Sequence, residues 1–307
     1  MRKSWVSLGV GLILVGIGGA ALCGFQFGKE PVAYSRTWTF GTDQLRGLSI
    51  EGDGHSFDIR FVPSDDGTNS VEMNGKIEPK LADRILRTDI EDGVLELNLE
   101  HDNRFFRLDI GDLGGIARKQ TVTVKLTPEA ESALKLMRLR SDAGSLHVSG
   151  AKTQEADIAT DAGTIRVDGF EGERLKLSCD LGKIEAADIR ADLEARTDFG
   201  NIDIRKATGS LEAATDAGTI NVDHLRGEAK LSADTGSVKL QKDDTSSADI
   251  KADAGSVQVE LPASFAGSYD LKSASGSVEA PEAQGTAADV VRVRTDTGNI
   301  RVSLLGR

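Results

Sequence analysis

The sequence predicts an all-β fold: a right-handed parallel β-helix (β-solenoid) with coils of about 18 residues, preceded by one N-terminal transmembrane helix. Three observations predict this fold. A turn motif recurs along the C-terminal half, apolar residues alternate with period two on both sides of each motif, and a long uncharged apolar segment lies near the N-terminus.

The recurring motif is Asp-x-Gly followed by a polar residue and then Ile, Leu or Val. Its successive glycines are separated by 19, 19, 18, 18, 18, 19, 21 and 22 residues. These turn glycines are Gly144, Gly163, Gly182, Gly200, Gly218, Gly236, Gly255, Gly276 and Gly298. A spacing this close to constant identifies an internal repeat, so one repeat is expected to form one coil.

The residues that flank each motif have the alternation of a β-strand. Leu175 and Leu177 precede one motif, and Ile220 and Val222 follow another. A second turn then returns the chain near Gly150, Gly169, Gly209 and Gly227. Because two short strands cannot bury an apolar face alone, neighbouring coils must stack into parallel sheets around a dry interior. Crossovers between parallel strands are overwhelmingly right-handed, which predicts right-handed coils.

The Asp and Gly of the motif have a structural explanation and a chemical alternative. In the first, the Asp carboxylate accepts hydrogen bonds from amides of its own turn, and the Gly adopts a positive φ. In the second, stacked carboxylates about 5 Å apart bind calcium, which relieves their repulsion. This metal ladder would comprise Asp142, Asp161, Asp180, Asp198, Asp216, Asp234 and Asp253. The calcium-binding β-roll nonapeptide is absent, so the structural explanation is preferred and no cofactor is expected.

The N-terminal segment predicts a membrane anchor. No charged residue occurs between Lys3 and Lys29, and the 23 residues from Trp5 to Phe27 are mostly apolar. As a helix they would reach about 34 Å, enough to cross a hydrocarbon core of about 30 Å. The basic residues at positions 2 and 3 place the N-terminus in the cytoplasm and the remaining chain outside the cell membrane.

Two other processing routes bear on this segment. A cleaved signal peptide is an open alternative, since small residues such as Gly19 and Ala21 occur before a cleavage point. Continuation of the apolar run through Phe27 argues for a spanning helix. Lipidation at Cys23 is disfavoured because Leu22, where a small residue is expected, precedes it.

These features divide the chain into four regions. Residues 1–28 form the basic tip and transmembrane helix, and residues 29–44 form a linker. Residues 45–136 form an irregular β region that caps or begins the solenoid, and residues 137–307 form the regular repeats. Asp92 and Gly93 predict a tight turn within the irregular region.

The repeats resemble those of a known bacterial family. The Asp-x-Gly-Ser/Thr-Ile/Val motifs, preceded by the Thr-Val-Thr-Val-Lys-Leu-Thr-Pro segment at 121–128, are similar to the candidate-adhesin family of unknown function that includes LiaG-like proteins. The resemblance covers about residues 45–305. It implies a membrane-anchored, outward-facing β-solenoid, with adhesion or an accessory role in an envelope-stress response as its function.

Composition and charge narrow the classes of function. The chain has 49 acidic and 37 basic residues and a net charge of −12, which disfavours nucleic acid as a partner. Its histidines, at positions 55, 101, 147 and 224, lack nucleophile or metal-ligand spacing, so no catalytic residue is predicted. We expect a non-enzymatic adhesin or envelope scaffold that binds cell-wall glycan or a surface protein. A glycan-active enzyme on a β-helix is the alternative.

Three late excursions in the repeat mark where a ligand site is expected first: residues 241–248, 261–267 and 280–288. Cys179 is expected in the core, at a small inward position. The chain ends just after an apolar strand that finishes at Leu304 and Leu305. An uncapped last coil would present a free strand edge, which predicts self-association through the ends of the solenoid.

Overall fold

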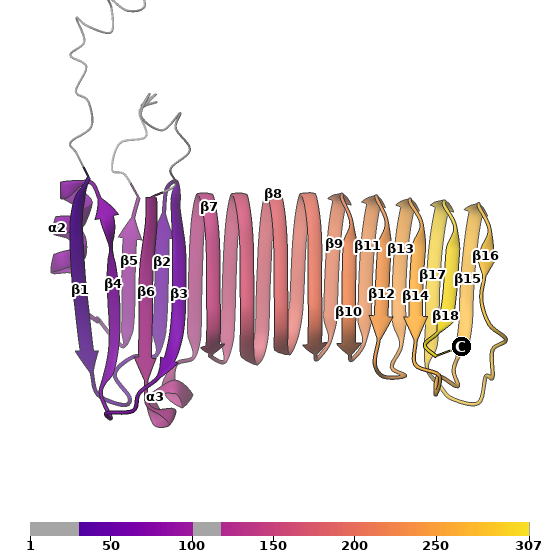
Figure 1. Ribbon diagram of the computed structural model, residues 1–307, viewed down its shortest axis with the longest axis horizontal. Coiled ribbons are helices and arrows are strands. Elements are labelled where there is room, and N and C mark those ends of the chain that lie inside the picture. Colours follow the sequence, from indigo (N-terminus) through magenta and orange to yellow (C-terminus); the bar gives the residue numbers. More distant parts are fainter. Residues whose placement is uncertain (1–30, 101–117, 307) are drawn as a thin grey trace, which may run out of the picture.

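The computed structural model describes residues 31–100 and 118–306, which form a long rod of stacked β-coils (Figure 1). The N-terminal part contains β1 (Val32–Phe40), β2 (Gly47–Gly52), β3 (His55–Pro63), β4 (Asn69–Ile77), α2 (Pro79–Arg87), β5 (Val94–Leu99), β6 (Arg118–Leu126) and α3 (Pro128–Ala133). The coils comprise β7 (Leu136–Lys152), β8 (Glu155–Thr208), β9 (Leu211–Ala217), β10 (Ile220–Arg226), β11 (Ala229–Thr235), β12 (Val238–Lys242), β13 (Ala248–Ala254), β14 (Val257–Leu261), β15 (Ser268–Ser275), β16 (Val278–Glu279), β17 (Val290–Thr297) and β18 (Ile300–Leu304).

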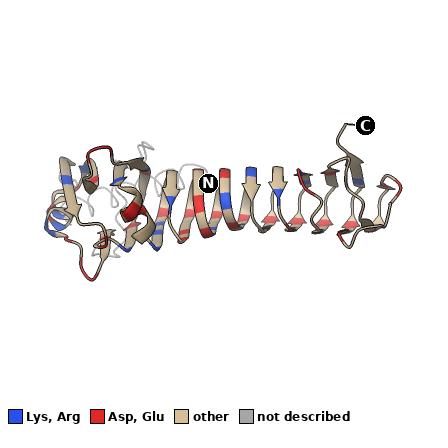
Figure 2. Cartoon of the chain, turned by 90° about the horizontal axis from the view of Figure 1, so that it is seen from below, with Lys and Arg blue, Asp and Glu red and all other residues tan. Residues whose placement is uncertain are grey.

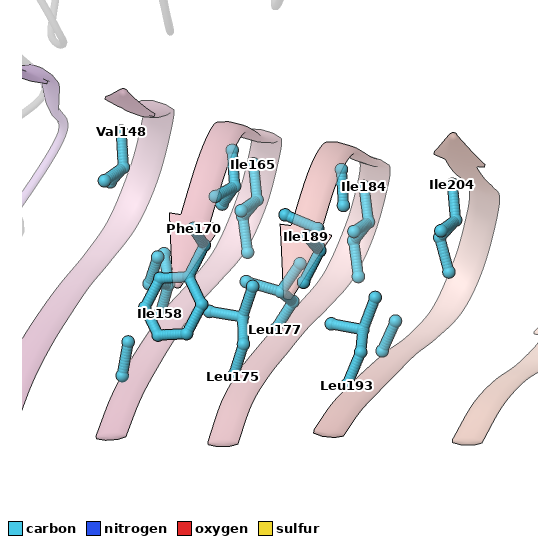
Figure 3. Close-up of a cluster of buried hydrophobic side chains, with 14 of the residues drawn as sticks. Val148, Ile158, Ile165, Phe170, Leu175, Leu177, Ile184, Ile189, Leu193 and Ile204 are labelled. Atoms are coloured by element: carbon cyan, nitrogen blue, oxygen red, sulfur yellow. The ribbon is translucent and has the colours of Figure 1, made fainter. Parts of the chain in front are cut away.

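The coils stack with their strands parallel and in register, as the repeat predicts. Between β7 and β8, Leu139 lies beside Ile158 and Leu146 lies beside Ile165. Every second side chain points into the interior, where apolar residues from successive coils form continuous rows (Figure 3). Cys179 is buried in this core, as predicted, and burial raises the pKa of its thiol. The observed architecture is therefore a parallel β-solenoid.

The N-terminal strands join the same solenoid. β2 and β3 each pair in parallel with β7 and so provide the coil that precedes it. β6 pairs in parallel with β3, whereas β4 and β1 extend this sheet with antiparallel pairs. Helix α2 begins at a proline, which suits the first helical turn, and buries Leu81, Ala82 and Ile85 against this end of the rod. Helix α2 therefore packs on this end of the rod, where β1 is the edge strand of its sheet.

The predicted linker over residues 29–44 is wrong where β1 lies. Tyr34 and Trp38 lie on the same face of this strand and are both buried. The Tyr34 hydroxyl donates to Gln120 Oε1 at 2.7 Å. Burial raises the pKa of Tyr34 above its ordinary range. A strand forms here because β4 offers an antiparallel partner over the full length of β1.

The predicted transmembrane helix falls within residues 1–30, which lie outside the described residues, as does His101. Within the described part of the chain, no helix has the length and apolar character needed to cross a membrane.

The last coil in the sequence is not the last coil in space. β17 and β18 insert between the coil of β13 and β14 and the coil of β15 and β16 (Figure 1). Charge explains this order, because Arg292 forms ion pairs with Asp249 at 3.2 Å and with Asp270 at 3.3 Å. Sequential stacking would place the two aspartates side by side. The expectation that the coil ending at Leu304 presents a free edge is therefore wrong, and β15 and β16 form the outermost coil.

Candidate ligand groove on the second-turn edge

The Asp-x-Gly turns line one edge of the rod and stack backbone on backbone. Gly200 has a φ of +155°, and a Cβ added to it would lie 1.6 Å from the carbonyl oxygen of Gly182 in the next coil. At every predicted turn glycine, an added Cβ would lie within 2.4 Å of a carbonyl oxygen in another coil. The predicted positive φ is found at all of these glycines except Gly255. Glycine is needed here for close packing between coils as well as for φ.

The hydrogen bonds of these turns come from the residue before the Asp. Thr215 Oγ1 donates to the carbonyl of Gly200 at 3.3 Å, and Ser273 Oγ donates to that of Gly298 at 2.9 Å. In the part of the chain that the structure describes, the Asp carboxylates accept no such bond from their own turns, contrary to expectation. The reason is direction: the residue before the Asp points inward, where the carbonyl needs a donor, and the Asp points outward to water.

The predicted calcium ladder is a row of mostly exposed carboxylates. Asp253 is half-buried and pairs with Lys251 at 3.0 Å. Burial, together with the charges of Asp53 and Asp161, raises the pKa of Asp142. Across residues 31–100 and 118–306, no group of three or more His, Cys, Asp or Glu side chains is arranged to hold a metal ion.

The second turns occupy the opposite edge of the rod and follow a repeated backbone pattern. Five of them begin with a residue at positive φ: Gly150 at +67°, Gly169 at +79°, Asp188 at +55°, Lys206 at +55° and His224 at +62°. The left-handed region costs a residue other than glycine of order 1 kcal/mol or more. Asp, Lys and His therefore hold a strained backbone in three successive coils of this edge.

The next two residues of each second turn build a groove. The second residue points into the core, as Phe170 and Ile189 do in Figure 3, and the third is polar and lies at the surface. The resulting groove encloses about 540 Å³ and crosses five coils. It is lined by Gly150, Ala151, Lys152, Gly169, Phe170, Glu171, Asp188, Ile189, Arg190, Lys206, Thr208, His224, Arg226 and Asp243. Figure 2 views the rod from this side and shows basic and acidic segments interleaved along it.

Other charged side chains of the groove are paired, both at its ends and next to Arg190. His224 Nδ1 lies 3.0 Å from Asp243 Oδ1, and Lys206 Nζ lies 3.7 Å from Asp188 Oδ1. At the other end, Lys152 Nζ lies 3.3 Å from a carboxylate oxygen of α3. Arg190, in the central coil, is exposed and has no ion-pair partner among the described residues. The centre of the groove thus presents a guanidinium that no carboxylate of the described chain neutralises.

The outer face of the sheet that contains β3 is, by contrast, occupied by its own ion pairs. His147 is half-buried and lies between Asp58, at 3.4 Å, and Asp168, at 3.1 Å. A hydrogen bond from Arg60 is the largest cause of the lowered pKa of Asp58, about 2. Lys119 Nζ also lies 2.9 Å from Asp58. These groups already bind one another, which leaves the groove as the better candidate site.

Lys242 takes the core position of the sixth second turn, where earlier coils place apolar residues. It lies beside Leu225, and its side chain is 0% exposed. The amine donates to the Gly227 carbonyl and, at 2.8 Å, to Ser246 Oγ, and it lies 3.1 Å from Asp244 Oδ1. Burial lowers the pKa of Lys242, and the ion pair with Asp244 opposes that shift. A buried cation therefore ends the apolar row under the groove.

This burial predicts a pH-dependent stability. The native pKa of Lys242 lies below the unfolded value of 10.5, so the unfolded chain binds more protons between those two pH values. Stability of the wild type relative to Lys242→Met should therefore rise as pH increases through that window. Urea unfolding of both proteins from pH 7 to 10.5 measures the difference. A difference that stays flat or falls would contradict the assignment.

The sequence located this site only in part. The predicted excursion 241–248 reaches the groove at Asp243, whereas 261–267 and 280–288 pack on each other near the C-terminal end, where the Thr286 amide donates to the Ala266 carbonyl at 2.9 Å. The basic groove residues were not predicted: Lys152, Arg190, Lys206 and Arg226. The available signal was the polar residue that recurs two places after the start of each second turn.

The family comparison agrees with the architecture. The model of the family described as Toastrack DUF4097 matches residues 48–240 and 206–303. The chain belongs to the Toastrack DUF4097 family. This confirms the resemblance to a candidate-adhesin family of unknown function. No curated protein matches this Toastrack chain significantly.

Solved structures similar to this Toastrack chain come from several bacteria. A candidate adhesin from Bacteroides fragilis is 14% identical with a TM-score of 0.42, covering 92% of this chain and 100% of its own. A candidate lipid-binding protein from Parabacteroides distasonis is 16% identical with a TM-score of 0.47, covering 88% and 96%. A candidate cell adhesion protein from Clostridium sporogenes is 9% identical with a TM-score of 0.17, covering 90% and 100%.

Proposed function

We propose that this Toastrack chain is a non-enzymatic binding protein of the bacterial cell envelope, and that its second-turn groove holds a linear anionic glycan. In this proposal the apolar N-terminal segment keeps the solenoid at the outer side of the cell membrane. The observation that carries it is Arg190, exposed at the centre of the groove and without an ion-pair partner among the described residues.

The groove suits an extended polymer. It runs along the rod axis over five coils, so it offers similar turns at intervals of about 4.8 Å. A linear chain of repeating units can meet this repeated surface without bending. Polar residues such as Glu171 and Thr208 lie at the rim of the groove, where they can form hydrogen bonds with a glycan.

The charge of the groove favours an anion over a neutral glycan. The guanidinium of Arg190 can bind a carboxylate or phosphate through two parallel hydrogen bonds. Asp188, in the same turn as Arg190, and Lys206, in the next coil, both have a strained backbone and pair with each other at 3.7 Å. Such strain at a surface groove is consistent with a binding role.

The test is binding of carboxylate-bearing peptidoglycan strands, with neutral linear dextran as the comparison, measured by calorimetry. Arg190→Gln should weaken binding of peptidoglycan strands by about tenfold, the loss expected for one charge-assisted interaction. Arg196→Gln is the matched control, because Arg196 is also exposed on β8 but does not line the groove. Binding should also weaken as salt increases.

Three outcomes would count against the proposal. Equal affinity for dextran and peptidoglycan would show that charge does not determine binding. Equal effects of the two arginine variants would show that the glycan does not bind in the groove. Release of shortened glycan products would favour the alternative of a glycan-active enzyme. Binding of neither polymer would favour an accessory role in an envelope-stress response.

A further inference from the structure

The C-terminal end of the rod is an open sheet edge. β15 pairs with β17 on one side, and no other strand of the described chain pairs with its outer side. Tyr269 and Leu271 on this strand are half-buried, and Val278 on β16 is 45% exposed. At the N-terminal end, α2 packs against β1 and β5 and buries Ile85, while β1 pairs only with β4 among the described strands. The two ends of the rod therefore differ in structure.

Two opposite charges lie on the outer face of this edge strand. Asp270 binds Arg292 and Arg294, and both contacts use its Oδ2 atom. Lys272 lies two residues further along β15, on the same face, and is exposed. It forms no ion pair with any residue that the structure describes. The edge thus carries a carboxylate with one oxygen outside these contacts and a cation without a counter-charge.

We propose that two copies of the chain pair through β15 as antiparallel strands, about a two-fold axis that passes at Leu271. In this register Asp270 of each copy lies opposite Lys272 of the partner subunit, which forms the same ion pair twice. Leu271 of each copy meets Leu271 of the partner subunit on the inner face, because residues 270 and 272 point outward and 271 points inward.

The residues at the two ends of the rod favour a closed, symmetric dimer over head-to-tail stacking. Head-to-tail stacking on β1, the edge strand at the N-terminal end, would offer β15 only the uncharged outward residues Ala33, Ser35, Thr37 and Thr39. An isologous pair uses the same edge from both copies and leaves neither β15 free for growth. Pairing would also remove the exposed strand edge, which is otherwise a template for aggregation. This interface is separate from the ligand groove.

Disulfide trapping tests the register in the full-length chain, purified in detergent, with Cys23 and Cys179 replaced by Ser. Residues directly opposite in an antiparallel pair have Cα atoms about 4.5–5.5 Å apart, a distance that a disulfide can bridge. Leu271→Cys should therefore give a covalent dimer on mild oxidation. Ser273→Cys should not, because its two copies would lie about 13 Å apart in this register. No dimer with Leu271→Cys, or an equal yield with Ser273→Cys, would overturn the proposal.

Charge reversal tests the ion pair independently, by sedimentation equilibrium of the same full-length chain without the cysteine changes. Lys272→Glu would face Asp270 of the partner subunit and should weaken dimerisation at least tenfold. Lys251→Glu is the matched control, since Lys251 has the same orientation on β13, inside the rod and away from the edge. A wild-type chain that remains monomeric at all concentrations, or equal effects of both variants, would overturn the proposal.

Discussion

Gly200→Ala is expected to lower the free energy of unfolding by about 4 kcal/mol or more, within the exceptional range for one substitution. The new Cβ would lie 1.6 Å from the carbonyl oxygen of Gly182 and 2.7 Å from its carbonyl carbon. Both contacts are with backbone, so no side chain can move aside to relieve them. The backbone cannot shift locally either, since Gly218 in the next coil approaches Gly200 in the same way. Urea unfolding followed by circular dichroism measures the effect.

Gly67→Ala measures the cost of a positive φ where no clash accompanies it. Gly67 also has a positive φ, at +74°, but an added Cβ would have no neighbouring atom within 4 Å. That substitution should cost only about 1 kcal/mol, the penalty for a left-handed residue other than glycine. Similar losses for both variants would show that φ, and not contact between coils, makes glycine necessary at the Asp-x-Gly turns.

The general architecture was predictable because its signals are local and repeated. The alternation of Ile, Leu and Val on both sides of each motif is enough to predict strands, and constant spacing is enough to predict coils. β1 was missed because only Tyr34 and Trp38 are buried within it, among polar residues. The residues it pairs with in β4 lie 29 to 45 positions further along the chain, so the pairing leaves no local pattern.

The coil order and the groove depend on which residues become neighbours once the coils are stacked. A signal for the observed coil order is the sign of the charge at Asp249, Asp270 and Arg292, which is informative only once the register is known. The same holds for the groove: Arg190 is recognised as part of a binding surface only when four neighbouring turns are stacked around it.

The inserted coil predicts an unequal response to two deletions. A chain that ends at Ala287 lacks β17 and β18, and it should lose the order of β15 and β16 as well, because these strands pair only with β17 and β18 among the described strands. Hydrogen exchange of residues 268–279 should therefore become as fast as in an unfolded segment. Residues 248–261 should keep most of their protection, since β13 and β14 still pair with β11 and β12.

Deletion of residues 266–285, which removes β15 and β16, should leave β17 and β18 docked on β13 and β14. Val291, Val293 and Ile300 are buried against that coil, and Arg292 retains its ion pair with Asp249 at 3.2 Å. Protection of residues 290–304 should therefore persist, with only faster exchange at their newly exposed edge. If the order of coils were sequential, the two results would be reversed: the chain ending at Ala287 would keep residues 268–279 protected, and the internal deletion would release residues 290–304.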